Sequence, residues 1–198
     1  NGEVNALAKD RKLLGPEPLI RWGVCRSIIN GVWLVPAYHP DGSLRQLYRY
    51  VGFGGGNRRL LPTTGLGAWM FGHDVKHLKD TVWICEGPWD ALALWEAMGV
   101  AKIAGDKLML TANESASLLS KTSILAVPGC QTLPEAWASA LAGKRIVLAY
   151  DSDHPKDGGV PAGFSGVKLA AGRIVGAESL AFLRWGPDGF DPSFPSGT

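Results

Sequence analysis

The stretch VWICEGPWDALALWEAMG, residues 82–99, decides the fold. A run of apolar residues typical of a buried strand ends at Glu86, and the apolar spacing of a helix begins shortly after it. Between them lie Gly87, Pro88 and a second acid, Asp90. Proline is well tolerated in the first turn of a helix, because the N–H that it lacks has no partner within the helix. The stretch therefore predicts a strand, a tight turn and a helix, with two carboxylates at the turn.

Acids near a helix N-terminus are favourable by about 0.3–1 kcal/mol, so capping explains Glu86 and Asp90 as well as a functional site does. A second acidic cluster favours a functional site over helix capping as the role of these acids. The apolar run KRIVLAY, residues 144–150, is followed by Asp151 and Asp153, which alternation in an extended chain places on one side. If the two strands are parallel neighbours, Glu86, Asp151 and Asp153 converge at the carboxyl edge of the sheet, where such folds bind ligands.

Carboxylates crowded at one edge repel each other, and a divalent cation removes this repulsion. Hard oxygen ligands suit Mg²⁺, or Mn²⁺, rather than zinc. The three cysteines, Cys25, Cys85 and Cys130, are far apart and odd in number, which argues against a disulfide framework or a zinc site. We therefore expect a magnesium site in a protein of a reducing, cytoplasmic compartment.

Strand-like and helix-like segments alternate from residue 80 onward. The pattern predicts strands at 81–85, 100–105, 123–127, 144–150 and 178–185, and helices at 88–98, 111–120, 132–143 and 162–175. Short apolar strands that alternate with helices indicate an α/β fold, with a parallel sheet covered by helices on both faces. We assign this unit to residues 80–198.

The first 79 residues predict a smaller α+β subdomain. Residues 1–14 have the pattern of a helix that Gly15 and the prolines after it would stop, and residues 32–38 and 44–51 predict a hairpin around the turn HPDG. The glycine-rich segment that follows predicts a loop, in which Arg58 and Arg59 have no acid nearby in sequence. We expect these two arginines to contact nucleic-acid phosphates rather than to form salt bridges.

The composition limits the classes of protein to which the chain can belong. The chain has 198 residues, 46% of them hydrophobic and 19% charged, which is typical of a globular protein. The net charge of +2 is too mild to indicate nucleic-acid binding by itself. No apolar run approaches the roughly 20 residues of a membrane span, so no membrane partner is expected. The first residues contain no initiator Met and no signal-peptide pattern, and we expect a fragment of a longer protein.

These motifs resemble those of the Toprim domain in bacterial DnaG-type and phage primases, including primase–helicases. EGPWDAL, residues 86–92, resembles the motif E-G-x-x-D-A; DSD, residues 151–153, resembles the D-x-D motif; and GPDGFDPSF, residues 186–194, resembles the segment P-x-G-x-D-P-x-D. The hairpin and the basic segment 57–74 are similar to the part of the primase core that precedes Toprim. The resemblance covers about residues 22–194.

The resemblance implies a DNA primase that makes short RNA primers on single-stranded DNA during replication, in a phage or mobile element. Its partners would be the DNA template, ribonucleoside triphosphates and a replicative helicase, in the same chain or separate. Glu86, Asp151 and Asp153 would be catalytic and bind the metal, with Asp90 and Asp191 in support. Template and primer phosphates need cations, for which the candidates are Arg45, Arg49, Arg58, Arg59 and Lys76.

The sequence departs from the family at four places. Ser193 stands where the family has its last acid, the segment between Gly99 and Ile124 is longer, nine residues separate the D-x-D motif from Gly163, and the zinc-binding module that usually precedes the core is absent from this fragment. Two alternatives stay open: a Toprim nuclease, which would lack the primase hairpin, and a non-catalytic Toprim module that binds nucleic acid or protein. A magnesium titration distinguishes the last of these, because a binding module need not bind metal.

Overall fold

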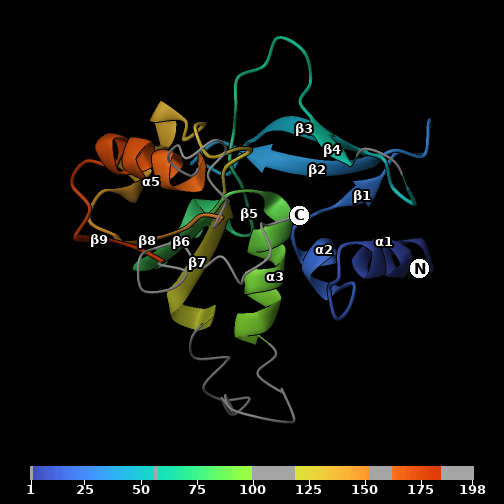
Figure 1. The fold of residues 1–198 in the computed structure, drawn as a ribbon, viewed down its shortest axis with the longest axis horizontal. Helices are drawn as coiled ribbons and strands as arrows, with labels where there is room; N and C mark the ends of the chain where they lie inside the picture. The colour runs from blue at the N-terminus through green and yellow to red at the C-terminus, as the bar shows by residue number, and fades with distance from the viewer. Residues whose placement is uncertain (1, 56–57, 100–118, 152–161, 184–198) are drawn as a thin grey trace.

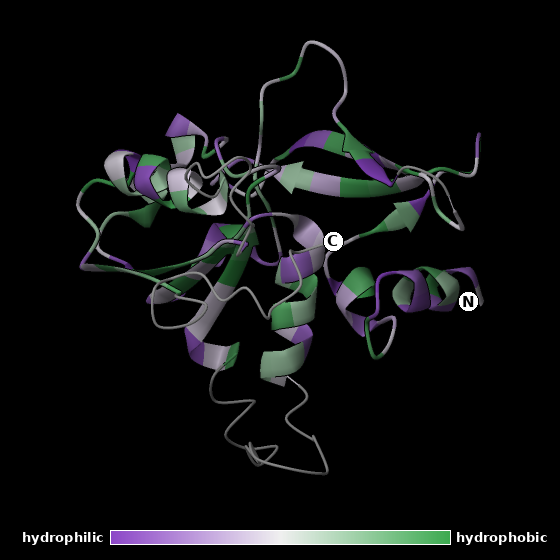
Figure 2. Ribbon diagram, viewed as in Figure 1, coloured by the Kyte–Doolittle hydropathy of each residue, from purple (hydrophilic) through white to green (hydrophobic). Residues whose placement is uncertain are grey.

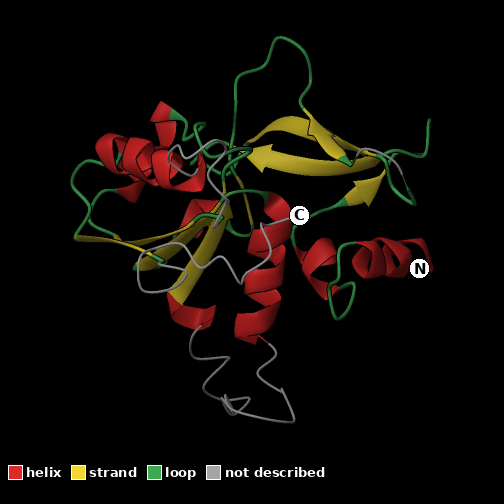
Figure 3. Ribbon diagram, viewed as in Figure 1, coloured by secondary structure: helices red, strands yellow, loops and turns green. Residues whose placement is uncertain are grey.

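Two β-sheets with helices packed against them make up the structure, a computed structural model that describes residues 2–55, 58–99, 119–151 and 162–183 (Figures 1 and 3). The predicted residues Asp153, Asp191 and Ser193, the predicted strand 100–105 and nearly all of the predicted helix 111–120 lie outside these ranges. None of the described helices has the length and apolar character needed to cross a membrane.

The first sheet is antiparallel and contains the predicted hairpin. Its strands follow one another in the order β1 (Cys25–Arg26), β2 (Trp33–Tyr38), β3 (Leu44–Val51) and β4 (Arg59–Leu61). Asp41 closes the predicted turn between β2 and β3 by accepting a hydrogen bond from the Ser43 N–H at 2.7 Å. The prediction of a continuous loop after β3 is wrong at β4, which pairs with β3 as a short edge strand.

The first fourteen residues do not form one helix. Helix α1 (Gly2–Asp10) ends because Lys12 adopts a left-handed conformation, with φ of 57°, and the Leu13 N–H returns to the Ala8 carbonyl. The prolines that were expected to stop a helix instead lie at the start of a second one, α2 (Glu17–Arg21). Proline fits a first turn for the reason given above. Leu7 and Leu19 bury these two helices against the core.

The second sheet is mainly parallel, as predicted. Its order is β5–β7–β6–β8–β9, where β5 is Phe71–Gly72, β6 is Thr81–Cys85, β7 is Thr122–Ala126, β8 is Arg145–Ala149 and β9 is Ser179–Phe182. Strands β6 to β9 pair in parallel, and only β5 pairs antiparallel, with β7. A short turn, η1 (Val75–His77), connects β5 to β6.

Helices cover both faces of this sheet. The side chains of β6 alternate: Cys85 packs in the core that holds α3 (Pro88–Gly99), and Val82 and Ile84 pack in the core that holds α5 (Ala162–Arg173). Helix α3 is mostly hydrophobic with a few polar residues (Figure 2), and its buried residues include Ala91 and Leu92. The first core also contains residues of α1, α2 and the antiparallel sheet, so it is continuous between the two sheets.

The helix predicted at 132–143 is wrong. The structure has two single 3₁₀ turns there, η2 (Glu135–Trp137) and η3 (Ser139–Leu141). Pro134 and Gly143 leave only a short segment between them, and no side chain caps its N-terminal end. So short a segment does not offset the cost of nucleating an α-helix, whereas tight turns still bury Trp137 and Leu141.

Candidate active site

The carboxyl ends of β6 and β8 bring Glu86 and Asp151 to one edge of the sheet. The two strands are parallel neighbours, and Cys85 is paired with Ala149. Glu86 follows the first of these residues directly, and Asp151 lies two positions after the second. Both acids line one cavity of about 410 Å³. The predicted neighbourhood of the two strands, and of these two acids, is therefore confirmed.

Asp90 lines the same cavity from the first turn of α3. The turn before the helix depends on Gly87, which has φ of 136°, a conformation that L side chains rarely adopt. A Cβ atom at Gly87 would also lie 3.1 Å from the Asp90 carboxylate. Glycine at this position lets the chain turn from β6 into α3 with Glu86 and Asp90 on the same side.

The charges of these acids affect the buried groups behind them. Burial raises the pKa of the Cys85 thiol, and the negative charges of Asp90 and Asp151 raise it further. Burial also raises the pKa of Tyr150, with a further contribution from the charge of Glu86. Two separate groups thus experience a negative potential at the end of β6 and β8, which is where a cation would be favoured.

Asp90 itself has a raised pKa. Asp90 is exposed as a residue, but protein atoms around the cavity partly desolvate its carboxyl group, and this desolvation is the largest cause; the positive charge of Arg11 acts in the opposite direction. No group of three or more acidic, histidine or cysteine ligands stands together in the described part of the chain. Two of the three predicted metal ligands, Glu86 and Asp151, are therefore placed, and Asp153 is not among the described residues.

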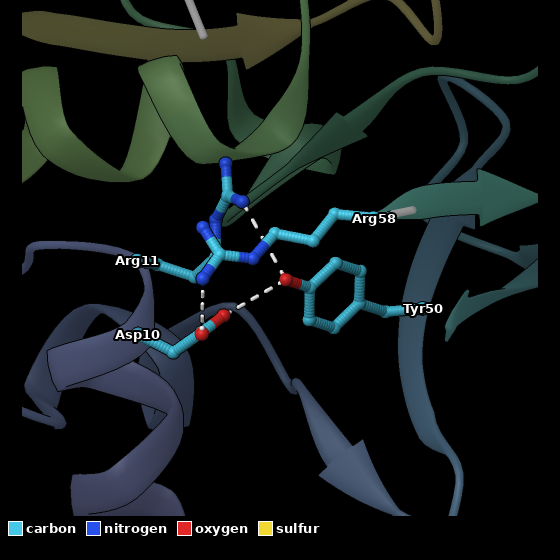
Figure 4. A network of polar contacts seen from close by, with 4 residues as sticks. All are labelled: Asp10, Arg11, Tyr50 and Arg58. Atoms are coloured by element: carbon cyan, nitrogen blue, oxygen red, sulfur yellow. Dashed lines mark hydrogen bonds and ion pairs between the residues drawn. The ribbon is translucent and has the colours of Figure 1, made fainter. Parts of the chain in front are cut away.

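A basic wall lines the same cavity as the acids. It is formed by the end of α1 and the start of β4, and its charged members are Arg11, Lys12, Arg58 and Arg59. Figure 4 shows how Asp10 organises part of this wall: one carboxylate oxygen accepts from Arg58 at 2.8 Å and the other accepts from the Tyr50 hydroxyl at 2.8 Å. The cavity therefore has both basic and acidic side chains in its lining.

Arg58 forms a salt bridge, which corrects the prediction made for it. Its partner, Asp10, lies 48 positions away in sequence, and only 10% of the Asp10 side chain is exposed, compared with 45% of the Arg58 side chain. The absence of a nearby acid in sequence was a poor guide, because the fold brings α1 beside β4. Arg58 and Arg59 both line the cavity, so a role in phosphate binding stays a prediction for both.

The other predicted cations lie elsewhere. Arg45 and Arg49 are exposed on β3; Arg45 is the extra residue where the register of the hairpin shifts, and its guanidinium lies 5.7 Å from the ring centre of Trp69. Lys76 lines a separate cavity, next to Gly42 of the hairpin turn. Of the predicted nucleic-acid-binding residues, Arg58 and Arg59 line the cavity that holds the acids, and Arg45, Arg49 and Lys76 do not.

Sequence reasoning missed the contribution of α1. Asp10, Arg11 and Lys12 belong to the segment that the sequence predicts as a helix without a functional role, yet all three line the cavity. The available signal was the charged run KDRK, residues 9–12, directly before the apolar pair at 13–14. The tyrosines Tyr48 and Tyr50 of β3 are 3% and 2% exposed, so both rings pack in the core.

Comparison with solved structures shows the fold. No protein-family model and no curated protein sequence matches the chain. The structure is similar to a chain in the complex of bacteriophage T7 lagging-strand DNA polymerase with primase domains bound to an RNA/DNA hybrid and dTTP. The TM-score is 0.54 and the identity 15%, over 86% of this chain and 75% of that one.

A second match is the zinc-binding and RNA polymerase domains of the Aquifex aeolicus primase. Its TM-score is 0.45 and its identity 18%, over 92% of this chain and 43% of that one. The likeness to the T7 complex shows that the chain has the fold of a primase domain. At 15% identity this likeness shows the fold and not the activity of the chain.

Proposed function

We propose that this chain is the catalytic core of a DNA primase, which joins ribonucleotides into short RNA primers on single-stranded DNA. The observation that carries the proposal is the cavity that Glu86 and Asp151, at the ends of parallel strands, line together with the basic wall formed by α1 and β4. The likeness to the T7 complex, whose primase domains are bound to an RNA/DNA hybrid and dTTP, supports the same class of reaction.

In this proposal the acids hold Mg²⁺ or Mn²⁺. Glu86 and Asp151, together with Asp153, would supply hard carboxylate oxygens, and the raised pKa values of Cys85 and Tyr150 are consistent with a negative potential that a cation would neutralise. A divalent cation stabilises the charge on the attacking and leaving oxygens in phosphoryl transfer. Asp90 and Asp191 would support these ligands from the flanking segments.

The basic wall would hold phosphate groups next to the acids. In primer synthesis a 3′-hydroxyl loses its proton, with Glu86 as the group that would assist the transfer, and attacks the α-phosphorus of the incoming nucleotide. A P–O bond forms, and pyrophosphate leaves with the electron pair of the bond that breaks. Arg58 and Arg59, which line the cavity, would contact phosphate oxygens of the nucleotide or the primer. Arg45, Arg49 and Lys76, which lie away from the cavity, would contact the DNA template further along.

The proposed partners follow from this activity. They are a single-stranded DNA template, ribonucleoside triphosphates and a replicative helicase, in the same chain or separate, in the replication of a phage or mobile element. The same acids could serve a nuclease. The hairpin of β2 and β3 favours the primase, because it forms part of the sheet from which Tyr50, Arg59 and Leu60 reach the cavity.

The test is incorporation of labelled ribonucleotides without a primer on single-stranded DNA, with magnesium and with a chelator. We expect magnesium-dependent products that Glu86→Gln abolishes and Glu135→Gln leaves unchanged, because Glu135 is exposed on η2 and does not line the cavity. Cleavage of nucleic acid in place of incorporation would identify a nuclease. Nucleic-acid binding that neither needs nor responds to magnesium would identify a binding module.

A further inference from the structure

Arg11 is held in the basic wall by two aromatic rings. Its guanidinium carbon lies 4.8 Å from the ring centre of Trp89 and 5.7 Å from that of Tyr50, and its Nη1 donates to the Tyr50 hydroxyl at 3.5 Å. The two rings contact each other edge to face, with centroids 4.9 Å apart. Contacts of this kind attract a cation while leaving its N–H edges available.

Trp89 connects Arg11 to the acids. This residue lies in the first turn of α3, between Pro88 and Asp90, so the ring that holds the guanidinium belongs to the same turn that positions Glu86. Tyr50, the second ring, is 2% exposed and is fixed by its hydrogen bond to Asp10. The guanidinium of Arg11 is therefore fixed relative to the carboxylates of the cavity.

Arg11 forms no salt bridge within the part of the chain that the structure describes; the charge of Asp90 acts on it without an ion pair between the two side chains. The adjacent acid, Asp10, uses one oxygen for Arg58 and the other for Tyr50, as Figure 4 shows. The Nε atom of Arg11 is buried without a hydrogen-bond partner among the described residues. A cation that is packed against rings, borders a cavity and has no salt bridge is one that can accept an anionic ligand at little cost.

The cavity indicates what that ligand is. Arg11, Lys12, Arg58 and Arg59 border it together, and a planar guanidinium fork matches the two oxygens of a phosphate. We propose that Arg11 is a phosphate-binding residue that grips the non-bridging oxygens of a phosphate group with its fork and positions that group against Glu86 and Asp151. The inference rests on the proposed function, which it deepens by naming the residue that fixes the phosphate.

Two sources could supply this phosphate: the triphosphate of a nucleotide or the backbone of the nucleic acid. Both have the same non-bridging oxygens, so geometry alone does not separate them. The experiment therefore uses two probes in the presence of magnesium: inorganic tripolyphosphate, measured by calorimetric titration, and a labelled single-stranded oligonucleotide, measured at several salt concentrations.

The variants are Arg11→Gln, Arg11→Lys and the control Arg21→Gln. Arg21 is an exposed arginine of α2 that pairs with Glu17 and does not line this cavity. For Arg11→Gln we expect a loss of about tenfold or more in affinity for one probe, because a charge-assisted contact is removed. Arg21→Gln should leave the affinity for tripolyphosphate unchanged.

The two probes identify the source. Weaker tripolyphosphate binding assigns Arg11 to the nucleotide; weaker oligonucleotide binding, with the salt slope reduced by about one phosphate contact, assigns it to the backbone. Unchanged affinity for both probes would overturn the inference. If Arg11→Gln does not fold, Arg11→Lys serves as the test variant, because lysine keeps the charge but has no guanidinium fork. Weaker phosphate binding by Arg11→Lys supports the inference. Wild-type affinity overturns it.

These measurements need no primer synthesis, so the two proposals can fail separately. A protein that makes no primers but loses tripolyphosphate affinity in Arg11→Gln would refute the proposed function and keep the phosphate site. A protein that makes primers, and whose Arg11→Gln variant binds both probes as the wild type does, would keep the function and refute the role of Arg11.

Discussion

Glu96 of α3 accepts a hydrogen bond from the backbone N–H of Leu14 at 2.7 Å, and its second oxygen accepts one from the Gly15 N–H at 3.0 Å. Glu96 is 7% exposed, so this is a buried carboxylate that serves the backbone of the segment between α1 and α2. The contact matters for the candidate site because that segment directly follows Arg11 and Lys12. Glu96 thereby fastens the basic wall to the helix that carries Asp90.

We expect Glu96→Gln to lower the free energy of unfolding by about 1–3 kcal/mol, because an amide can offer only one oxygen to the two buried N–H donors. Chemical denaturation measures the loss. The matched control is Glu135→Gln on the exposed turn η2, which should change stability by less than about 0.5 kcal/mol. A Glu96→Gln protein as stable as the control variant would show that the segment is held by other contacts.

Gly163, at the start of α5, allows the helix to approach the backbone of Asp151. A Cβ atom at this position would overlap the Asp151 carbonyl oxygen, so Gly163→Ala must displace either the helix or the acid. We expect a loss of about 1–3 kcal/mol in stability, as for other overpacked sites, and reduced primer synthesis.

The control for this prediction lies in the same helix. Gly172 has no atom within 4 Å of a built Cβ, so Gly172→Ala should be neutral or stabilising by up to about 1 kcal/mol, from helix propensity alone. Equal effects of the two substitutions would contradict the close approach of α5 to Asp151.

Asp90 and Asp41 should show opposite dependence on pH. Desolvation raises the pKa of Asp90 above its ordinary value of 3.8, so the charged form disfavours the folded state. As the pH rises from about 4 through the raised pKa of Asp90, its carboxyl group becomes charged. The wild type then becomes less stable relative to Asp90→Asn. Asp90→Asn should therefore melt higher than the wild type at pH 7, and the difference should shrink in acid.

For Asp41 the sign is reversed. Hydrogen bonds from Ser43 are the main cause that lowers the pKa of Asp41 to about 2, with a smaller contribution from His39. The stabilisation that Asp41 provides is complete above its ordinary value of 3.8 and disappears as the pH falls through 2. Asp41→Asn should melt lower than the wild type at pH 7. Melting curves of both variants at several pH values test the pair, and the same sign for both would refute the assignment.

Arg59 should contribute to the salt dependence of nucleic-acid binding. It lines the cavity from the start of β4, and we expect Arg59→Ala to reduce the slope of log affinity against log salt by about one phosphate contact. Arg145→Ala is the control, because Arg145 begins β8 and so lies at the strand end opposite Asp151. Identical salt slopes for Arg59→Ala and Arg145→Ala would show that Arg59 does not contact nucleic-acid phosphates.

The sequence was most informative where a continuous apolar run ended in acids. Strands β6 and β8 and the shared edge of Glu86 and Asp151 followed from that pattern, because burial on both faces leaves little else that such a run can form. Strand β4 could not be predicted, because a three-residue edge strand with an arginine has no periodicity. The pairing of Asp10 with Arg58 was also out of reach, because it depends on how α1 packs and not on a local signal.

Primer synthesis by Asp151→Asn shows whether the acids at the strand ends serve catalysis or helix capping. This substitution keeps the shape of the side chain and removes one charge from a crowded acidic edge. We expect ribonucleotide incorporation to collapse, while the melting temperature without magnesium is equal to that of the wild type or slightly higher, because repulsion among the carboxylates is relieved. An Asp151→Asn protein that is destabilised but still makes primers would contradict the account.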